Sequence, residues 1–465
     1  MRKNLLITVG LILFIASLYA QDKFATSLHA TREGKRTAYV KENGGMELIT
    51  GISMDSLACL KCHPQKYADG SDVDAKTYKP SCKDCHNFAQ GSSVLQTACL
   101  GCHNRQSYEM QMYPDSTENG DVHRKKGLKC INCHTKEEVH GDDGIAYKSW
   151  MDEGAVKTKC TNCHPVSSLP TNAEHTMHGT NTEKFDCNVC HTQSIVSCTN
   201  CHFETLIATG SNRAQTKISG FQLLLKRNGK FTAGTYMTHT YNGKTNVIVA
   251  PFRSHLITKK GKNCDACHAN MGNKNAAIAE YNNTGNIQMT KWDEANKKLT
   301  WAKGIIPVTA DWNKAFKFDF TTYTGDVNNL TSDPQKWTYL KSDVDNAHLY
   351  YAEALTADEM KKLGFTRDPV GVKNITQNEA FKLWNCYPNP ANSFTSIKYN
   401  IITGSNLKIS IISKEGKEVS TIINSYMNPG EYVTKYNTKE LSSGLYYVIL
   451  SSGNKQLTQK LIVKH

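Results

Sequence analysis

Long apolar runs are scarce in this chain of 465 residues. Hydrophobic residues make up 39% of it and the mean hydropathy is −0.50, which excludes a membrane protein with many spanning helices. Beyond residues 1–20, no segment approaches the roughly 18 consecutive apolar residues of a membrane-spanning helix, so we expect the mature chain not to cross a membrane by itself. Charged residues at 21% and an aromatic content of 9% argue against wholesale disorder.

The N-terminus has the pattern of a Sec signal peptide. Two basic residues, Arg2 and Lys3, precede a short apolar stretch, and the small residue Ala20 stands before a polar start. The stretch is short for a spanning helix, although an N-terminal membrane anchor is the alternative. No cysteine lies near Ala20, so a lipid-attached N-terminus is not indicated. We therefore expect residues 1–20 to be removed and the mature chain to be exported.

Cysteine is abundant, yet a disulfide framework is not indicated, because 16 of the 17 cysteines fall in one repeated pentapeptide. The pattern C-x-x-C-H occurs eight times and leaves only Cys386 outside it. It is the attachment signature of c-type haem, in which two thiols bind the haem and the adjacent histidine lies under the iron. A single copy could equally be a zinc site or a redox dithiol, but eight copies favour haem. The chain resembles the multihaem c-type cytochromes over residues 59–268.

This resemblance implies eight covalently bound haem c groups per chain. In chain order, the eight motifs cover 59–63, 82–86, 99–103, 130–134, 160–164, 187–191, 198–202 and 264–268. The predicted attachment residues are Cys59, Cys62, Cys82, Cys85, Cys99, Cys102, Cys130, Cys133, Cys160, Cys163, Cys187, Cys190, Cys198, Cys201, Cys264 and Cys267. The predicted proximal iron ligands are His63, His86, His103, His134, His164, His191, His202 and His268.

The spacing of the motifs predicts haems that lie close together. Eight motifs share 210 residues, about 26 residues each, which is too little protein to surround every haem separately. The sixth and seventh motifs start only 11 residues apart and predict the closest pair. The haems are therefore expected to supply much of the apolar core and to pass electrons from iron to iron.

Nine histidines lie outside the motifs, and the last of them, His465, belongs to a C-terminal segment that we expect to be removed. The other eight are candidate distal ligands: His29, His123, His140, His175, His178, His239, His255 and His348. If all eight bind iron, every haem is six-coordinate and no position is open for a substrate, which indicates an electron carrier without catalytic residues. His175 and His178, three residues apart, could serve two neighbouring haems, with zinc binding as the alternative.

His239 and His348 are the candidates that the sequence leaves open. If one of them does not bind iron, Met112, Met177, Met237 or Met271 could replace it. Otherwise one haem has an open position, as in octahaem enzymes that act on small nitrogen or sulfur compounds. Some of those enzymes carry lysine in place of one motif histidine, whereas all eight motifs here end in histidine.

The rest of the first 380 residues predicts strands and loops. Two Asn-Gly pairs, 228–229 and 242–243, lie between apolar or alternating runs and predict a three-stranded meander that ends near residue 249. Residues 269–350 predict loops and short strands over the haems, and Thr356 with Glu359 has the spacing of a helix capping box. Asp69, Asp72 and Asp74 could bind calcium, although a solvated turn is the simpler interpretation.

The C-terminal segment 381–465 changes to short alternating strands, which predict a small β-sandwich. Its Tyr-Pro-Asn-Pro opening from Tyr387, its Leu-Ser-Ser-Gly-Leu-Tyr block from Leu441 and its basic last strand resemble the sorting domain of type IX secretion. The resemblance implies the type IX machinery as a partner, cleavage of the domain, and release or attachment at the outer cell surface. A generic adhesion module is the alternative. Cys386 lacks the motif context, so a ninth haem is not expected.

These observations predict five parts: a signal peptide (1–20), a seven-haem region (21–210), a meander with the eighth haem and covering loops (211–370), a linker (371–380) and the sorting β-sandwich (381–465). We expect a multihaem cytochrome fold of coil and short helices around stacked haems. The expected function is electron transfer across or outside the outer membrane, between other redox proteins and an extracellular acceptor or donor. The alternatives are an octahaem oxidoreductase for tetrathionate, nitrite or hydroxylamine, and a subunit of a self-associating haem filament.

The formal net charge of +13 would ordinarily suggest nucleic acid as a partner. Residues 1–20 and 381–465 contribute +2 and +6, which leaves +5 for residues 21–380. Eight haems with their propionates bring the mature protein to about −3 when oxidised and about −11 when reduced. Nucleic acid is therefore not expected to bind.

Overall fold

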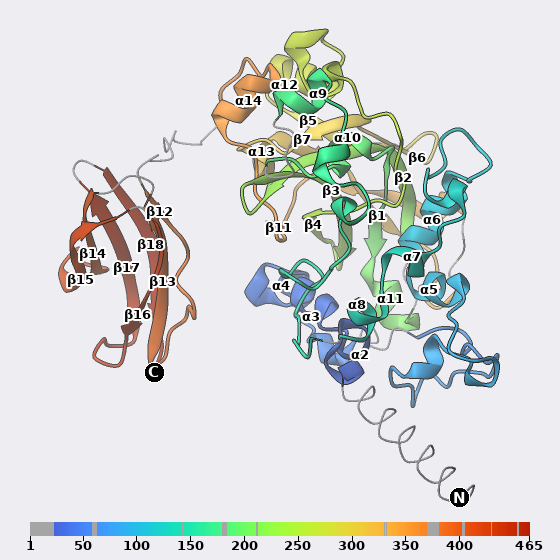
Figure 1. The fold of residues 1–465 in the computed structure, drawn as a ribbon, viewed down its shortest axis with the longest axis horizontal. Helices are drawn as coiled ribbons and strands as arrows, with labels where there is room; N and C mark the ends of the chain where they lie inside the picture. The colour runs from blue at the N-terminus through green and yellow to red at the C-terminus, as the bar shows by residue number, and fades with distance from the viewer. Residues whose placement is uncertain are drawn as a thin grey trace, which may run out of the picture. The chain divides into compact units, whose positions relative to one another are not determined.

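The structure is a computed structural model of the whole chain. It describes residues 23–57, 63–141, 143–178, 184–210, 213–329, 331, 333–369, 381–401, 405–428, 430–452 and 455–465. The predicted signal peptide and linker, together with Cys59 and Cys62, lie outside the described residues. The chain divides into two compact units, Met1–Gly371 and Val372–His465, and each is described by itself (Figure 1).

Short helices joined by coil and 3₁₀ turns make up the first half of the first unit, as the sequence predicts. The helices are α2 (Leu28–Thr31), α3 (Glu33–Tyr39), α4 (Glu47–Thr50), α5 (Gln96–Cys102), α6 (Asn104–Met112), α7 (Cys130–Cys133), α8 (Lys136–His140), α9 (Ala173–Met177), α10 (Asn188–His191) and α11 (Phe203–Thr209). In the described part of the chain, no helix is long and apolar enough to cross a membrane.

This helical region has very little apolar core of its own. Among the described residues between 63 and 188, the buried apolar side chains are Tyr78, Met151 and Ala155. Large apolar side chains that are exposed there include Phe88, Leu95, Ile131 and Met177. Ordering a residue costs about 1–2 kcal/mol of backbone entropy, which folded chains offset mainly by burying apolar surface. Protein side chains alone therefore do not account for the order of this region.

A six-stranded sheet follows, in the order β11-β4-β3-β1-β2-β7. Its strands are β1 (Ile195–His202), β2 (Arg213–Arg227), β3 (Lys230–Tyr241), β4 (Lys244–Pro251), β7 (Gly304–Pro307) and β11 (Asn346–Leu349). The predicted meander β2-β3-β4 is confirmed, and Asn228, Gly229, Asn242 and Gly243 all have the positive φ that its two tight turns require. It is part of a larger sheet than predicted, because β1 pairs in parallel with β3 and antiparallel with β2.

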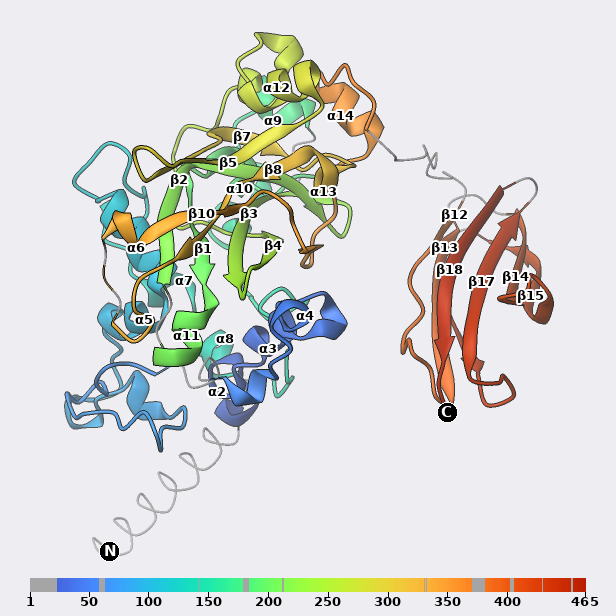
Figure 2. The same ribbon diagram turned by 180° about the vertical axis from the view of Figure 1, so that it is seen from behind.

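The main apolar core of the first unit lies between this sheet and the segments that follow it. Figure 2 shows the covering strands from the side on which β5, β8 and β10 are in view. They are β5 (Ile287–Asp293), β6 (Lys298–Trp301), β8 (Phe316–Phe318), β9 (Phe320–Tyr323) and β10 (Trp337–Lys341), with helices α12 (Ala276–Thr284), α13 (Trp312–Ala315) and α14 (Ala357–Leu363). The capping box at α14 is observed, because the Thr356 hydroxyl accepts from the Glu359 N–H and the Glu359 carboxylate accepts from the Thr356 N–H.

The second unit is a β-sandwich with its own apolar core. One sheet has the order β12-β13-β16 and the other β15-β14-β17-β18. The strands are β12 (Phe381–Leu383), β13 (Phe394–Ile401), β14 (Ser405–Ser413), β15 (Glu418–Met427), β16 (Gly430–Asn437), β17 (Gly444–Ser452) and β18 (Lys455–Val463). Cys386 is buried in this core with 3% of its surface exposed.

Candidate haem-binding site

Six of the eight motifs fold into the same local structure, a single helical turn. They lie in η4 (Cys82–Asp84), α5, α7, η7 (Cys160–Asn162), α10 and η9 (Cys264–Ala266) or directly beside them. In each motif the histidine N–H donates to the carbonyl of the first cysteine at 2.9–3.0 Å. Residues three and four apart share one face of a helical turn, so this turn brings the two thiols and the imidazole to the same side.

Each of these six motif histidines faces a second histidine from outside the motifs. The ring-centre distances are 6.1 Å for His29 and His103, 6.0 Å for His86 and His140, 6.2 Å for His123 and His164, 6.1 Å for His134 and His255, 6.3 Å for His175 and His191, and 6.1 Å for His178 and His268. We call these the six histidine pairs. Their second members come from distant parts of the chain, such as α2, α8, α9 and the loop after β4.

The spacing within the pairs fits one metal ion between two imidazoles. An imidazole nitrogen lies about 2 Å from a bound metal ion, and the ring centre lies about 1 Å further away. Two imidazoles on opposite sides of one ion therefore have centres about 6 Å apart. Rings in direct van der Waals stacking would be closer, because carbon contacts are about 3.5–4 Å.

Hydrogen bonds hold several of these rings by their Nδ1 atoms, which leaves Nε2 to face the partner ring. Nδ1 of His86 donates to the Ser92 carbonyl. In the same way, Nδ1 of His191 donates to the Thr258 carbonyl and Nδ1 of His268 to the Lys362 carbonyl, each at 3.0 Å. Nδ1 of His175 bonds the side-chain oxygen of Asn172 at 2.5 Å, and Nδ1 of His178 donates to the Glu174 carbonyl at 3.1 Å. A partner at one ring nitrogen fixes both the orientation of the ring and the nitrogen that is free to bind a metal.

Glu138 is the most prominent supporting residue, and the sequence analysis did not single it out. The Nδ1 of His134 donates to its carboxylate at 2.5 Å, and the N–H groups of Lys157 and Thr158 donate to it at 2.8 and 3.0 Å. The hydrogen bond between His134 and Glu138 raises the pKa of His134. Although burial raises the pKa of Glu138, its bonds outweigh that effect and lower it to about 2. The sequence carried no clear signal for this contact, because His134 ends α7 and Glu138 lies on α8, so their contact depends on the extended residues between the two helices.

Burial keeps other pair members neutral. It lowers the pKa of His29 to about 4, with His103 adding to the shift, and it lowers the pKa of His255 to about 4, with His134 adding to it. A neutral imidazole is the form that binds a metal ion. Glu109, which lies 3.8 Å from His255 Nδ1, accepts the His255 N–H at 3.0 Å and the Ser254 hydroxyl at 2.7 Å, and so helps to hold this loop.

The seventh motif is built differently, because it lies in strand β1. Cys201 is opposite His239 on β3 and His202 is opposite Thr240, so Cys201 and His202 point to opposite faces of the sheet. The His202 ring is buried against Tyr323 and Trp337, and its Nε2 lies 3.2 Å from Glu204. Its Nδ1 has no hydrogen-bond partner among the described residues.

The two candidates that the sequence leaves open, His239 and His348, do not belong to the six pairs. His239 is buried opposite Cys201, and His348 on β11 is half-buried. Burial lowers the pKa of His239 to about 4, with His348 adding to the shift, and burial lowers the pKa of His348 to about 4. His239 Nδ1 lies 3.3 Å from the Asn246 amide, whereas both ring nitrogens of His348 are buried without a partner in the part of the chain that is described. Unpartnered buried polar atoms are uncommon in folded proteins and point to a missing partner.

The other sequence candidates take varied positions. His63 of the first motif packs against Tyr78 at 5.4 Å between ring centres. Met237 accepts a hydrogen bond from Arg105 at 2.9 Å, whereas the candidate methionines that are exposed are Met112, Met177 and Met271. His465 bonds the Leu441 carbonyl of the second unit at 2.8 Å.

The three carboxylates considered for calcium are engaged locally. Asp69 accepts from Ser71, Asp72 pairs with Lys66 at 3.1 Å, and Asp74 accepts from the Lys76 N–H and the Thr77 hydroxyl at 2.9 Å. Among the described residues, no group of three or more His, Cys, Asp or Glu side chains forms a metal-binding cluster. Calcium binding stays a prediction.

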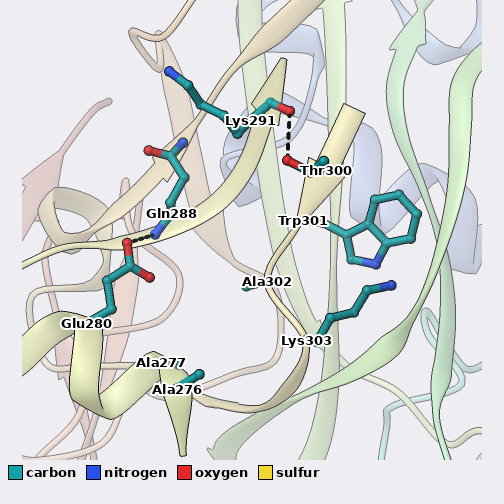
Figure 3. Close-up of a pocket in the computed structure, with 9 residues that line it drawn as sticks. All are labelled: Ala276, Ala277, Glu280, Gln288, Lys291, Thr300, Trp301, Ala302 and Lys303. Atoms are coloured by element: carbon teal, nitrogen blue, oxygen red, sulfur yellow. Dashed lines mark hydrogen bonds between the residues drawn. The ribbon is translucent and has the colours of Figure 1, made fainter. Parts of the chain in front are cut away.

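A pocket of about 220 Å³ lies at α12, β5 and β6 (Figure 3). Its polar groups bond one another: Glu280 accepts from the Gln288 N–H at 3.0 Å, and Thr300 donates to the Lys291 carbonyl at 3.2 Å. The Lys303 ammonium lies 3.8 Å from the centre of the Trp301 ring. None of its lining residues is a candidate haem ligand, so the pocket is not part of the site.

Comparison with known proteins identifies the tail of the chain. Residues 385–464 match the family described as secretion system C-terminal sorting domain. The second unit is therefore a type IX sorting domain, and the chain is a secreted or cell-surface protein that interacts with the type IX secretion machinery.

The other similarities are more distant. The chain is 22% identical over 201 residues to the dissimilatory sulfite reductase MccA of Wolinella succinogenes, a match that covers 30% of this chain and 28% of that enzyme. Among solved structures, an endo-β-1,4-mannanase from Thermotoga petrophila aligns over 40% of each chain, with 12% identity and a TM-score of 0.16. A TM-score this low carries no argument about fold or activity.

Proposed function

We propose that this chain is an octahaem c-type cytochrome that carries electrons at or outside the outer cell surface. The observation that carries the proposal is the set of six histidine pairs, each formed by one motif histidine and one histidine from elsewhere. Six such coincidences at a spacing of 6.0–6.3 Å are not expected of histidines that serve only as surface residues. The sorting domain supports the location.

The scarcity of apolar core between residues 63 and 188 supports the same proposal. Haem is a large apolar group, and several haems attached through this segment would bury the exposed side chains around them. Bound haem supplies a one-electron redox centre whose potential depends on its axial ligands, their hydrogen bonds and its burial. The paired imidazoles would hold such a group from both sides, and the bonds at Nδ1 would keep the rings in place.

Two measurements test the proposal. Intact mass of the exported protein should show eight haems attached, and electron paramagnetic resonance of the oxidised protein should be dominated by low-spin ferric haem. A chain without covalent haem would refute the cofactor assignment. High-spin ferric haem at a majority of the eight sites would refute paired histidine ligation.

A second candidate function is reduction of a small sulfur or nitrogen compound at the seventh haem. It is favoured by the strand geometry of that motif, where His202 packs against Tyr323 and Trp337 instead of a histidine, and by the similarity to a dissimilatory sulfite reductase. It predicts a high-spin signal equivalent to one haem. It also predicts rapid oxidation of the reduced protein by sulfite, tetrathionate, nitrite or hydroxylamine, whereas a pure carrier is expected to react with none of them selectively.

A further inference from the structure

Several short elements support two different histidine pairs at once, which fixes how the pairs neighbour one another. Helix α8 carries Glu138, which bonds His134, and two residues later His140, whose ring lies 6.0 Å from His86. The fourth and second motifs are therefore joined by one turn of helix. Helix α9 does the same for the sixth and eighth motifs, because its His175 faces His191 and the following His178 faces His268.

Backbone bonds connect the remaining neighbours. The fourth and fifth motifs are joined by the segment before Cys160, whose Thr158 hydroxyl donates to the Cys133 carbonyl at 2.6 Å. The sixth and eighth motifs are joined a second time, because the N–H of Lys262 donates to the Cys190 carbonyl at 3.0 Å.

Other contacts link the second motif to the third and the fifth to the sixth. Helix α2, which carries His29, packs against α8, which carries His140. The Ile257 carbonyl accepts the N–H of Val122, next to His123, at 3.0 Å, and the neighbouring Thr258 carbonyl accepts from His191 Nδ1 at 3.0 Å. In both ribbon views α5 and α7, which carry the third and fourth motifs, lie side by side (Figures 1 and 2).

The seventh motif has different neighbours. Cys198 is opposite Lys217 on β2, and the Lys217 ammonium lies 3.8 Å from the centre of the Tyr108 ring on α6. Arg105 also lies on α6, which begins directly after His103, and its guanidinium bonds Met237 on β3. The seventh motif therefore lies beside the third motif.

We infer that the haems of the second, third, fourth, fifth, sixth and eighth motifs form one file in this order, with the haem of the seventh motif as a side branch at the third. This inference rests on the proposed function and adds the route to it. Electrons enter or leave the file near Phe88 at one end and near Met271 at the other. Among the haems of the motifs that the structure describes in full, the fifth is the only crossing point between the two halves of the file.

The test attaches the full-length protein to a gold electrode at either end of the file. Phe88→Cys places a thiol beside His86, since the Phe88 ring stacks on His86 at 5.3 Å and is 63% exposed. Met271→Cys, at a position that is 51% exposed, places one just after the eighth motif. Cys386 is only 3% exposed and does not compete for the gold surface. Fast-scan voltammetry then counts the electrons exchanged per molecule.

Two matched deletions each remove one haem. Cys160→Ala with Cys163→Ala removes the fifth haem, which lies in the file, and Cys198→Ala with Cys201→Ala removes the seventh, which lies on the branch. Without the fifth haem, we expect fast exchange with only two haems from the Met271 end. Without the seventh, we expect fast exchange with at least the six haems of the file from both ends. His123→Met keeps the fifth haem but raises its potential, and should slow exchange with the far half from both ends.

The proposed order is wrong if the protein without the fifth haem still exchanges seven electrons quickly from both ends. It is also wrong if, without the seventh haem, either end exchanges electrons quickly with only part of the file. It is also overturned if His123→Met leaves both exchange rates unchanged. These outcomes differ from failure of the proposed function, which would show as fewer than eight haems by intact mass in the unmodified protein.

Discussion

Replacing Glu138 by glutamine tests whether the carboxylate tunes the haem of the fourth motif. The change keeps the shape of the side chain but removes the charge that His134 Nδ1 meets at 2.5 Å. A neutral hydrogen bond contributes about 1 kcal/mol net, and a charge-assisted bond is roughly twice as strong. The carboxylate stabilises the more positive ferric state through the ligand, so Glu138→Gln should destabilise that state by about 1 kcal/mol. For a one-electron couple, a tenfold change in the equilibrium constant corresponds to 59 mV. A change of about 1 kcal/mol should therefore raise the reduction potential of this haem by about 40 mV.

Optical redox titration of the purified protein measures this shift as a change in the reduction potential of one haem among eight. Glu137→Gln is the matched control, because Glu137 is the neighbouring residue on α8, pairs with Lys136 and has 45% of its side chain exposed. The control should leave every potential in place. The reasoning is wrong if Glu138→Gln shifts none of the potentials, or if Glu137→Gln shifts one by the same amount.

Three other outcomes follow from the structure. Protein produced without covalent haem should lose the order of residues 63–188, and limited proteolysis should cut there while the second unit stays intact; equal resistance with and without haem would contradict this. Burial raises the pKa of Cys386 to about 11, so its thiol should stay unmodified by iodoacetamide at pH 8 until denaturant is added, and rapid labelling of the native protein would count against its burial. Gly229→Val places a β-branched residue at φ 73° in the β2-β3 turn and should lower the unfolding free energy by more than about 1 kcal/mol, whereas Lys230→Val just outside the turn should not; denaturant titration compares the two.

The eight proposed haem-attachment motifs could be read from the sequence because the chemistry of attachment is local. Two cysteines and a histidine within five residues define the site wherever the segment lies in the fold. The two Asn-Gly turns and the capping box at Thr356 were predictable for the same reason, since each depends on two to four neighbouring residues. The sorting domain was recognised from short blocks of its own sequence, and the family match confirms it.

The sequence supplied eight candidate distal histidines but could not assign them, and six of these eight pair with a motif histidine in the structure. His29 faces His103 and His134 faces His255, pairings between residues 74 and 121 positions apart that no local spacing encodes. Only the tertiary structure decided these pairs, because they depend on where α2 and the loop after β4 come to lie.

The seventh motif shows the limit of local reasoning most clearly. Its pentapeptide matches the others, yet pairing of β1 with β2 and β3 imposes strand geometry and turns Cys201 and His202 to opposite faces of the sheet. The sequence by itself determined the sorting domain, the eight C-x-x-C-H motifs and the turns, because these are properties of contiguous residues. The tertiary structure decided which imidazoles meet, how the motifs neighbour one another and which motif departs from the helical turn, because these depend on contacts between segments that are distant in the chain.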